Sequence, residues 1–123
     1  MDVAILRMVA PRGRRDEILH ALRWLVAPIR SRAGCAGCRI LQDLDDENAL
    51  VLVEEWSSRR DFVRHLRSDD YRRLLAVAEA AAEPPEIRFD HVVEQRGLDL
   101  VTEVRDGADP LSQALKKAEA GGI

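Results

Sequence analysis

The chain is predicted to fold as an α+β domain of the ferredoxin-like type, with the element order β-α-β-β-α-β and an antiparallel sheet. Short segments rich in β-branched residues alternate with longer segments whose apolar residues recur at helical spacing. A polar turn joins the second and third strand segments, which is typical of a hairpin, whereas the other connections contain helices. Each helical segment has one apolar stripe, so both helices can cover the same face of the sheet.

The first strand and the first helix are indicated by their patterns and their ends. A strand is expected at residues 3–9, where β-branched residues alternate before Pro11. A helix is expected at residues 15–32, because its apolar residues fall on one face. Pro28 should kink this helix or loosen its last turn, and Gly34 is a suitable stop. The apolar stripe contains Ile18, Leu22, Leu25 and Ile29.

The second half of the domain is expected to contain a strand, a polar turn, a strand, an interrupted helix and a last strand. These elements are assigned to residues 38–43, 44–48, 49–56, 57–78 and 87–94. The helix begins at Ser57 or Ser58, since Ser58 and Asp61 have the spacing of a capping box. It pauses near Ser68 and then resumes.

Residues 97–123 are interpreted as an extension of a domain that spans residues 1–96. Residues 98–105 could form a fifth strand or an arm that crosses a partner, and would then strengthen a dimer. Asp109 and Pro110 suit an N-cap and a first helical residue, so a short helix is expected to follow them.

The composition is that of an ordinary globular protein, and it argues against several partners. The formal net charge is −3, which disfavours nucleic acid because phosphate binding requires a surplus of positive charge. The chain has no apolar run long enough to span a bilayer and no visible leader, so we expect no membrane partner and a cytoplasmic location. The two cysteines should then remain reduced.

The two central strand segments predict an interface. Residues 3–9 and 49–56 are apolar on both faces. In a monomer the sheet face without helices would expose apolar surface to water. We therefore expect a homodimer in which these uncovered faces pack together.

Four segments, in order, resemble the antibiotic biosynthesis monooxygenase family, with quinol-monooxygenase-like members as the nearest relatives. They are GCAGCR at 34–39, DLDDEN at 43–48, VEEWSS at 53–58 and FVRHLRSDDY at 62–71. The resemblance covers roughly residues 3–94 and implies a dimeric α+β barrel with a pocket between helices and sheet. The family's characterised enzymes oxidise phenolic or quinol-type aromatics with molecular oxygen, without metal or bound flavin. The resemblance therefore implies a small aromatic substrate, molecular oxygen as partner and no cofactor.

The chain departs from the family pattern in two places: Cys38 stands where an aromatic residue is common, and the C-terminal extension is additional. The same superfamily includes haem-degrading enzymes. These carry a tryptophan at the position of His65, a histidine at that of Leu75 and an asparagine in the first strand segment. Because all three are missing here, haem degradation is disfavoured.

His65 is the candidate catalytic residue, since imidazole titrates near neutral pH and can take a proton from a phenol or quinol. The resulting anion is electron-rich and can react with oxygen, so such an enzyme needs little beyond a base and a dry pocket. His65 should line a largely apolar cavity, with Trp56, Phe62 or Tyr71 among its neighbours. The alternative is a histidine that packs on Trp56 or caps a carbonyl.

Four residues are candidates for substrate binding: Arg7, Trp56, Phe62 and Tyr71. The aromatic residues could shape the pocket, although a tryptophan at a strand end more often seals a core. Arg7 interrupts an apolar strand, so it either holds an anionic oxygen or pairs with a carboxylate at the dimer interface.

Cys35 and Cys38 form a Cys-x-x-Cys motif that follows a helix and opens a strand, the opposite polarity from redox motifs. Two cysteines also cannot complete a tetrahedral zinc site, so no metal is expected.

Two candidate functions remain for the protein. One is a cofactor-independent monooxygenase acting on a quinol-like or phenolic aromatic molecule. The other is a non-catalytic dimeric domain that binds a small apolar ligand.

Overall fold

The computed structural model describes residues 1–121 in two compact units, the first from Met1 to His91 and the second from Val92 onward. The first unit contains a four-stranded sheet in the order β2-β3-β1-β4, with every neighbouring pair antiparallel. The strands are β1 (Asp2–Val9), β2 (Cys35–Gln42), β3 (Ala49–Trp56) and β4 (Glu86–His91).

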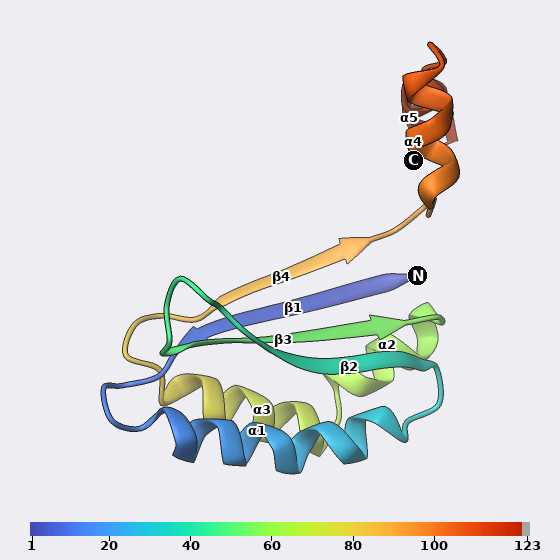
Figure 1. Ribbon diagram of the computed structural model, residues 1–123. Helices are drawn as coiled ribbons and strands as arrows, with labels where there is room; N and C mark the ends of the chain where they lie inside the picture. Colours follow the sequence, from blue (N-terminus) through green and yellow to red (C-terminus); the bar gives the residue numbers. More distant parts are fainter. Residues whose placement is uncertain (122–123) are drawn as a thin grey trace. The chain divides into compact units, whose positions relative to one another are not determined.

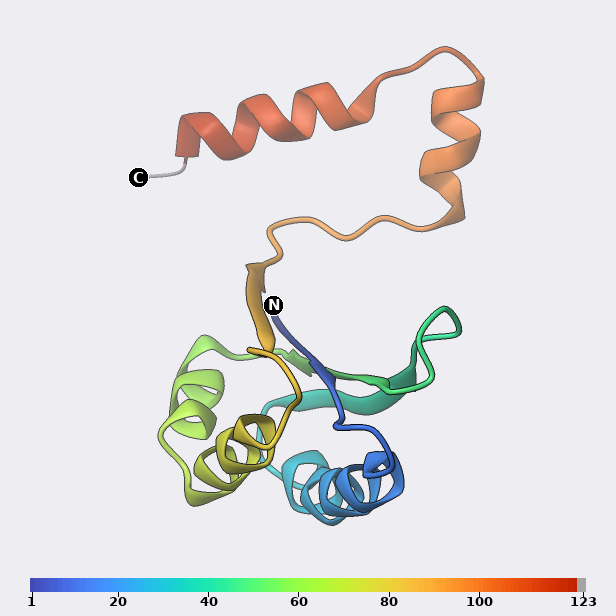
Figure 2. The ribbon, with the colours of Figure 1, turned by 90° about the vertical axis from the view of Figure 1, so that its left-hand side faces the viewer.

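Three helices cover one face of this sheet, as Figures 1 and 2 show. They are α1 (Arg15–Arg30), α2 (Arg59–Leu66) and α3 (Asp69–Glu79). The predicted ferredoxin-like α+β fold is therefore confirmed. Within the chain the sheet is open and does not close into a barrel.

Several predicted boundaries need correction. Strand β2 begins at Cys35 rather than Cys38, because Cys35 pairs with Trp56 across an irregularity between Cys35 and Gly37. Strand β4 ends at His91, where its pairing with β1 ends at Asp2. Helix α1 ends at Arg30 and contains Pro28 in its last turn.

The interrupted second helix is confirmed as two helices with separate caps. The Ser58 hydroxyl accepts a hydrogen bond from the Asp61 amide at 3.3 Å at the start of α2. The Ser68 hydroxyl accepts one from the Tyr71 amide at 3.2 Å at the start of α3. Each cap satisfies an amide that the first turn of a helix leaves without a partner.

Side-chain alternation divides the sheet into a covered face and a bare face. Every second residue of β1 is buried beneath the helices, and Leu50, Leu52, Glu54 and Trp56 of β3 have the same orientation. The residues between them lie on the bare face and are only partly buried. On β1 and β3 the apolar residues of the bare face are Val3, Ile5, Val9, Val51 and Val53.

The second unit corrects the prediction of a fifth strand, while an arm that crosses a partner stays a prediction. Residues Leu98–Arg105 form helix α4, and Pro110–Gly121 form α5. Asp99 and Glu103 lie one turn apart on α4, and both pair with Arg96 just before the helix, at 2.8 Å and 2.9 Å. The predicted N-cap of α5 is confirmed, since Asp109 accepts a hydrogen bond from the Ser112 amide.

None of the helices in the described part of the chain is both long enough and apolar enough to cross a membrane.

Candidate active site

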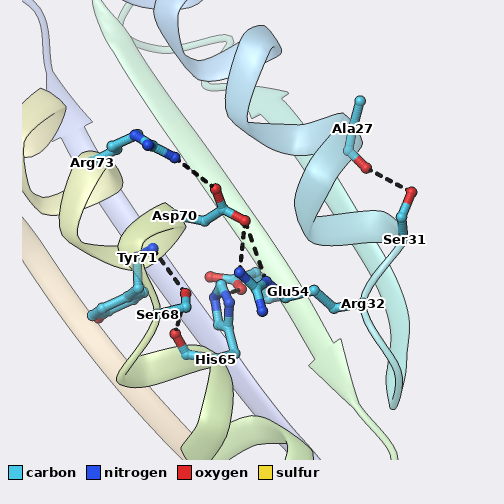
Figure 3. A network of polar contacts seen from close by, with 9 residues as sticks. All are labelled: Ala27, Ser31, Arg32, Glu54, His65, Ser68, Asp70, Tyr71 and Arg73. Atoms are coloured by element: carbon cyan, nitrogen blue, oxygen red, sulfur yellow. Dashed lines mark hydrogen bonds and ion pairs between the residues drawn. The ribbon is translucent and has the colours of Figure 1, made fainter.

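A buried acid–base pair lies between the covered face of β3 and helix α2. Glu54 and His65 have relative exposures of 2% and 0%, and Glu54 Oε1 lies 2.6 Å from His65 Nε2. Figure 3 shows the two side chains meeting. Both groups can carry charge, and neither has access to water in this conformation.

Aromatic rings surround the imidazole. The His65 ring stacks on Trp56 with the ring centroids 4.5 Å apart, and it meets Tyr71 edge to face at 5.4 Å. Phe62 lies against Trp56 at 6.3 Å and against Phe89 at 5.8 Å. The structure thus brings together four of the five residues singled out in the sequence.

The junction between α2 and α3 positions two of these rings. The Ser68 hydroxyl donates a hydrogen bond to the His65 carbonyl at 2.6 Å while accepting one from the Tyr71 amide (Figure 3). Asp70 links the same junction to its surroundings, through Arg32 before β2 at 2.9 Å and Arg73 at 3.1 Å. One hydroxyl therefore holds the backbone of His65 and of Tyr71 in a single turn.

The polar atoms of the pair are poorly satisfied. Although Glu54 Oε1 and His65 Nε2 are within ion-pair distance, their alignment does not meet that of a hydrogen bond. His65 Nδ1 and Trp56 Nε1 are also buried without a hydrogen-bond partner among the described residues. Buried polar groups in this condition cost stability. Such a cost is typical of sites retained for function.

A small cavity adjoins the pair, with a volume of about 10 Å³. This is room for roughly one water molecule. Glu54 and Tyr71 line it together with apolar side chains of β1, α3 and β4, but His65 does not, contrary to expectation. Three of the lining residues, Leu75, Ile87 and Phe89, are 37%, 43% and 50% exposed. The outer wall is therefore formed by side chains that have solvent on one side.

Burial and Glu54 together shift the nearby titratable groups. Burial, followed by the negative charge of Glu54, raises the pKa of the Tyr71 hydroxyl, which stays protonated at neutral pH. The same two causes raise the pKa of the Cys38 thiol to about 12. Burial likewise raises the pKa of the Cys35 thiol. Neither cysteine is therefore a thiolate at neutral pH.

No group of three or more histidine, cysteine or carboxylate side chains with metal-binding geometry occurs in the described part of the chain. Cys38 lies opposite Glu54 on the neighbouring strand, which explains why Glu54 raises the pKa of the Cys38 thiol.

Arg7 is not part of this cluster. It lies on the bare face of β1, between the buried residues Leu6 and Met8, and it pairs with Asp43 at 3.3 Å. Because successive strand residues point to opposite faces, Arg7 and Glu54 cannot contact the same ligand in one subunit.

Glu54 is a residue of the site that the sequence did not single out. The available signal was the position of Glu54 in the alternation along β3, which places it on the same face as Leu50, Leu52 and Trp56. A carboxylate in phase with core residues is uncommon, and it identifies a site.

The fold and the buried pair define a ferredoxin-like α+β domain with a polar site between its helices and its sheet. Solved structures from three organisms share this fold. A protein from Nitrosomonas europaea is 23% identical, with a TM-score of 0.68, over 76% of this chain and 100% of its own. One from Mycobacterium tuberculosis is 22% identical, with a TM-score of 0.68, over 79% and 100%. One from Pseudomonas aeruginosa is 26% identical, with a TM-score of 0.65, over 76% and 94%.

Residues 1–77 match the family model described as antibiotic biosynthesis monooxygenase. The chain therefore belongs to the antibiotic biosynthesis monooxygenase family. No curated protein matches it in sequence.

Proposed function

We propose that the protein is a cofactor-independent monooxygenase that acts on a quinol-like or phenolic aromatic molecule. The observation that carries this proposal is the buried Glu54–His65 pair beside an apolar cavity. A base in a dry pocket is the main requirement for activating such a substrate toward oxygen.

In the proposed reaction, a hydroquinone and molecular oxygen give a hydroxyquinone and water. The base takes a phenolic proton, and the resulting anion passes an electron to oxygen. Recombination forms a carbon–oxygen bond, and cleavage of the oxygen–oxygen bond releases water with a proton returned by the base. The substrate supplies all the electrons, so no external reductant is required.

Glu54 and His65 act as one base in this scheme. Glu54 is the member that lines the cavity, and His65 lies behind it at 2.6 Å, where it can accept the proton once the two side chains align as a hydrogen bond. Tyr71 lines the cavity, Trp56 stacks on the imidazole, and Phe62 lies against Trp56. An aromatic substrate enters by rotation of the half-exposed side chains Leu75 and Phe89.

We also propose that the protein works as a homodimer in the cytoplasm. The apolar bare face of β1 and β3 supports the dimer, and Arg7 with Asp43 then lies at the interface. Its two cysteines are free thiols, which is usual in a reducing compartment.

Oxygen uptake with a panel of hydroquinones tests the monooxygenase. The wild-type protein should consume one oxygen molecule per hydroxyquinone formed. Glu54→Gln and His65→Ala should each lower turnover roughly 100- to 10,000-fold, the usual effect of removing a general base. His20→Ala is the matched control, because His20 is an exposed histidine of α1 outside the cavity. Equal rates in all four proteins would reject the proposed base.

The second candidate function is a non-catalytic dimeric domain that binds a small apolar ligand at the same cavity. The full burial of His65, which keeps the imidazole out of the cavity lining, favours it over a catalytic role. Saturable binding of a hydroquinone without oxygen uptake would support this function over the first.

A further inference from the structure

A second hollow lies on another side of the first unit, between helix α1 and strand β2. Its volume is about 420 Å³, which falls within the usual range of small-molecule sites. Strand β2 is at the edge of the sheet, so this hollow, called here the α1–β2 groove, is built from different residues than the Glu54–His65 site.

The α1–β2 groove is lined by three arginines of α1, namely Arg15, Arg23 and Arg30, and by no carboxylate among the described residues. Arg15 donates to the Gln42 side chain at 2.8 Å and pairs with the highly exposed Asp16 at 3.1 Å. Arg30 donates through Nε to the Cys38 carbonyl at 2.8 Å. The groove therefore carries positive charge that its own walls do not neutralise.

Two of these guanidinium groups have unused hydrogen-bonding capacity. Arg23 makes no hydrogen bond or ion pair with any described residue, although it lines the groove. Arg15 Nε is buried and has no hydrogen-bond partner among the described residues. Arg15 Nε itself is closed off from solvent, so an anionic group in the groove would meet the guanidinium of Arg23 and the terminal nitrogens of Arg15.

The floor of the groove is apolar, formed by Leu19, Val26, Ile40 and Leu50. A neighbouring hollow of about 280 Å³ shares Arg23 and Ala27 with it and is walled by Trp24. The Trp24 side chain is 72% exposed, and its Nε1 donates to His20 Nε2 at 3.0 Å. An exposed tryptophan held in one orientation by a neighbour is typical of a contact surface for an apolar group.

We propose that the α1–β2 groove binds a small apolar molecule that carries one anionic head group, a carboxylate or a phosphate. Arg15 and Arg23 bind the head group, since guanidinium matches both anions in a bidentate manner. The apolar body lies on the floor of the groove and extends toward Trp24. This site is independent of the proposed monooxygenase activity.

A small molecule fits the geometry better than a lipid surface does. The apolar floor lies below the arginine heads, and Val26 and Leu50 are only 5% and 1% exposed. A flat surface would contact the arginines and Trp24 but leave this floor empty, whereas a narrow molecule can reach it.

Calorimetric titration with decanoate and with decyl phosphate, below their micelle concentrations, tests the proposal on the full chain. At least one of them should bind with a 1:1 stoichiometry, and the better one identifies the head group. Uncharged decanol should bind at least about tenfold more weakly, because charge-assisted hydrogen bonds are lost. The emission of Trp24 should shift on binding, and Trp24→Phe should abolish the shift while the buried Trp56 keeps its emission.

Variants of exposed arginines assign the site. Arg23→Gln should weaken the affinity for the better anion about tenfold. Arg60→Gln is the matched control, because Arg60 is likewise exposed and makes no ion pair with a described residue; it should bind as the wild type does. The proposal is overturned if neither anion binds, if decanol binds equally well, if the two variants behave alike, or if binding occurs only to anionic vesicles.

Discussion

The two faces of the sheet differ in which residues depart from the usual pattern of apolar residues in the core and polar residues at the surface. On the covered face, beneath the helices, the exceptions are polar: Glu54 is buried with His65, and Asp2 is buried at the start of β1. On the bare face the exceptions are apolar: Ile5 and Val53 pair across β1 and β3 with no helix of the first unit over them. The same two strands supply both sets.

Each exception indicates a different kind of function. A buried polar pair costs stability, so its retention indicates chemistry. A partly exposed apolar stripe on a sheet indicates a partner surface. The following predictions test whether the two faces are specialised in this way.

The largest expected effect is on the bare face. Val53→Lys places a charge in the middle of the proposed interface, where it would be desolvated. It should convert the dimer to a monomer at micromolar concentration, as measured by light scattering. Leu44→Lys is the control, because Leu44 is 95% exposed in the β2–β3 turn, and it should remain dimeric. A monomeric wild-type protein would contradict the interface.

On the covered face, a double-mutant cycle separates chemistry from stability. Glu54→Leu and His65→Leu should each lower the free energy of unfolding by about 3 kcal/mol, because each leaves a buried polar group without its partner. The double variant should lie within about 1 kcal/mol of the wild type in urea denaturation, yet have no activity. If the two losses simply added, the two side chains would stabilise the fold independently and would not act as a pair.

The ion pair between Arg59 and Asp2, at the edge of the covered face, should control the stability of the fold at acid pH. Arg59 donates two hydrogen bonds to the buried Asp2 carboxylate, at 2.7 and 2.9 Å, and this holds the pKa of Asp2 below its usual value of 3.8. His91 Nδ1 adds a contact at 3.1 Å. Because the ionised form is favoured by folding, the stabilisation is complete above the unfolded-state pKa and is lost as the pH falls through the folded-state pKa.

Asp2→Asn should therefore lower the melting temperature by a few degrees at neutral pH, and the difference from the wild type should shrink below about pH 4. Calorimetry across this range measures it. Asp69→Asn is the control, since Asp69 is 72% exposed and its ion pair with Arg72 is 3.6 Å long. A difference that persisted at pH 2 would rule out the ionic origin.

The smallest expected effect concerns the thiols. With a pKa raised to about 12, Cys38 should resist alkylation by iodoacetamide at pH 8, and Cys35 should react slowly. Replacing Cys35 by Ser and Cys38 by Ala should leave activity within severalfold. A large loss in the double variant that neither single variant shows would instead support dithiol chemistry.

Local patterns were sufficient for most of the first unit, because alternation and helical spacing are properties of neighbouring residues. The cap at Ser58 and the interruption of the helix near Ser68 were predicted for the same reason. The residues after Gly97 were misread because their β-branched residues favoured a strand.

The sequence by itself determined the order of elements, the aromatic cluster around His65 and the apolar character of both faces of the sheet. These depend on periodicity and on spacing along one segment. Tertiary structure alone decided that Glu54 meets His65 across 2.6 Å and that Arg7 lies on the other face. It also decided that three arginines of α1 overlook the edge strand β2. Such contacts depend on how a helix lies against a strand that is distant in sequence. This placement is determined by the packing of the whole core, so no single segment of the sequence reveals it.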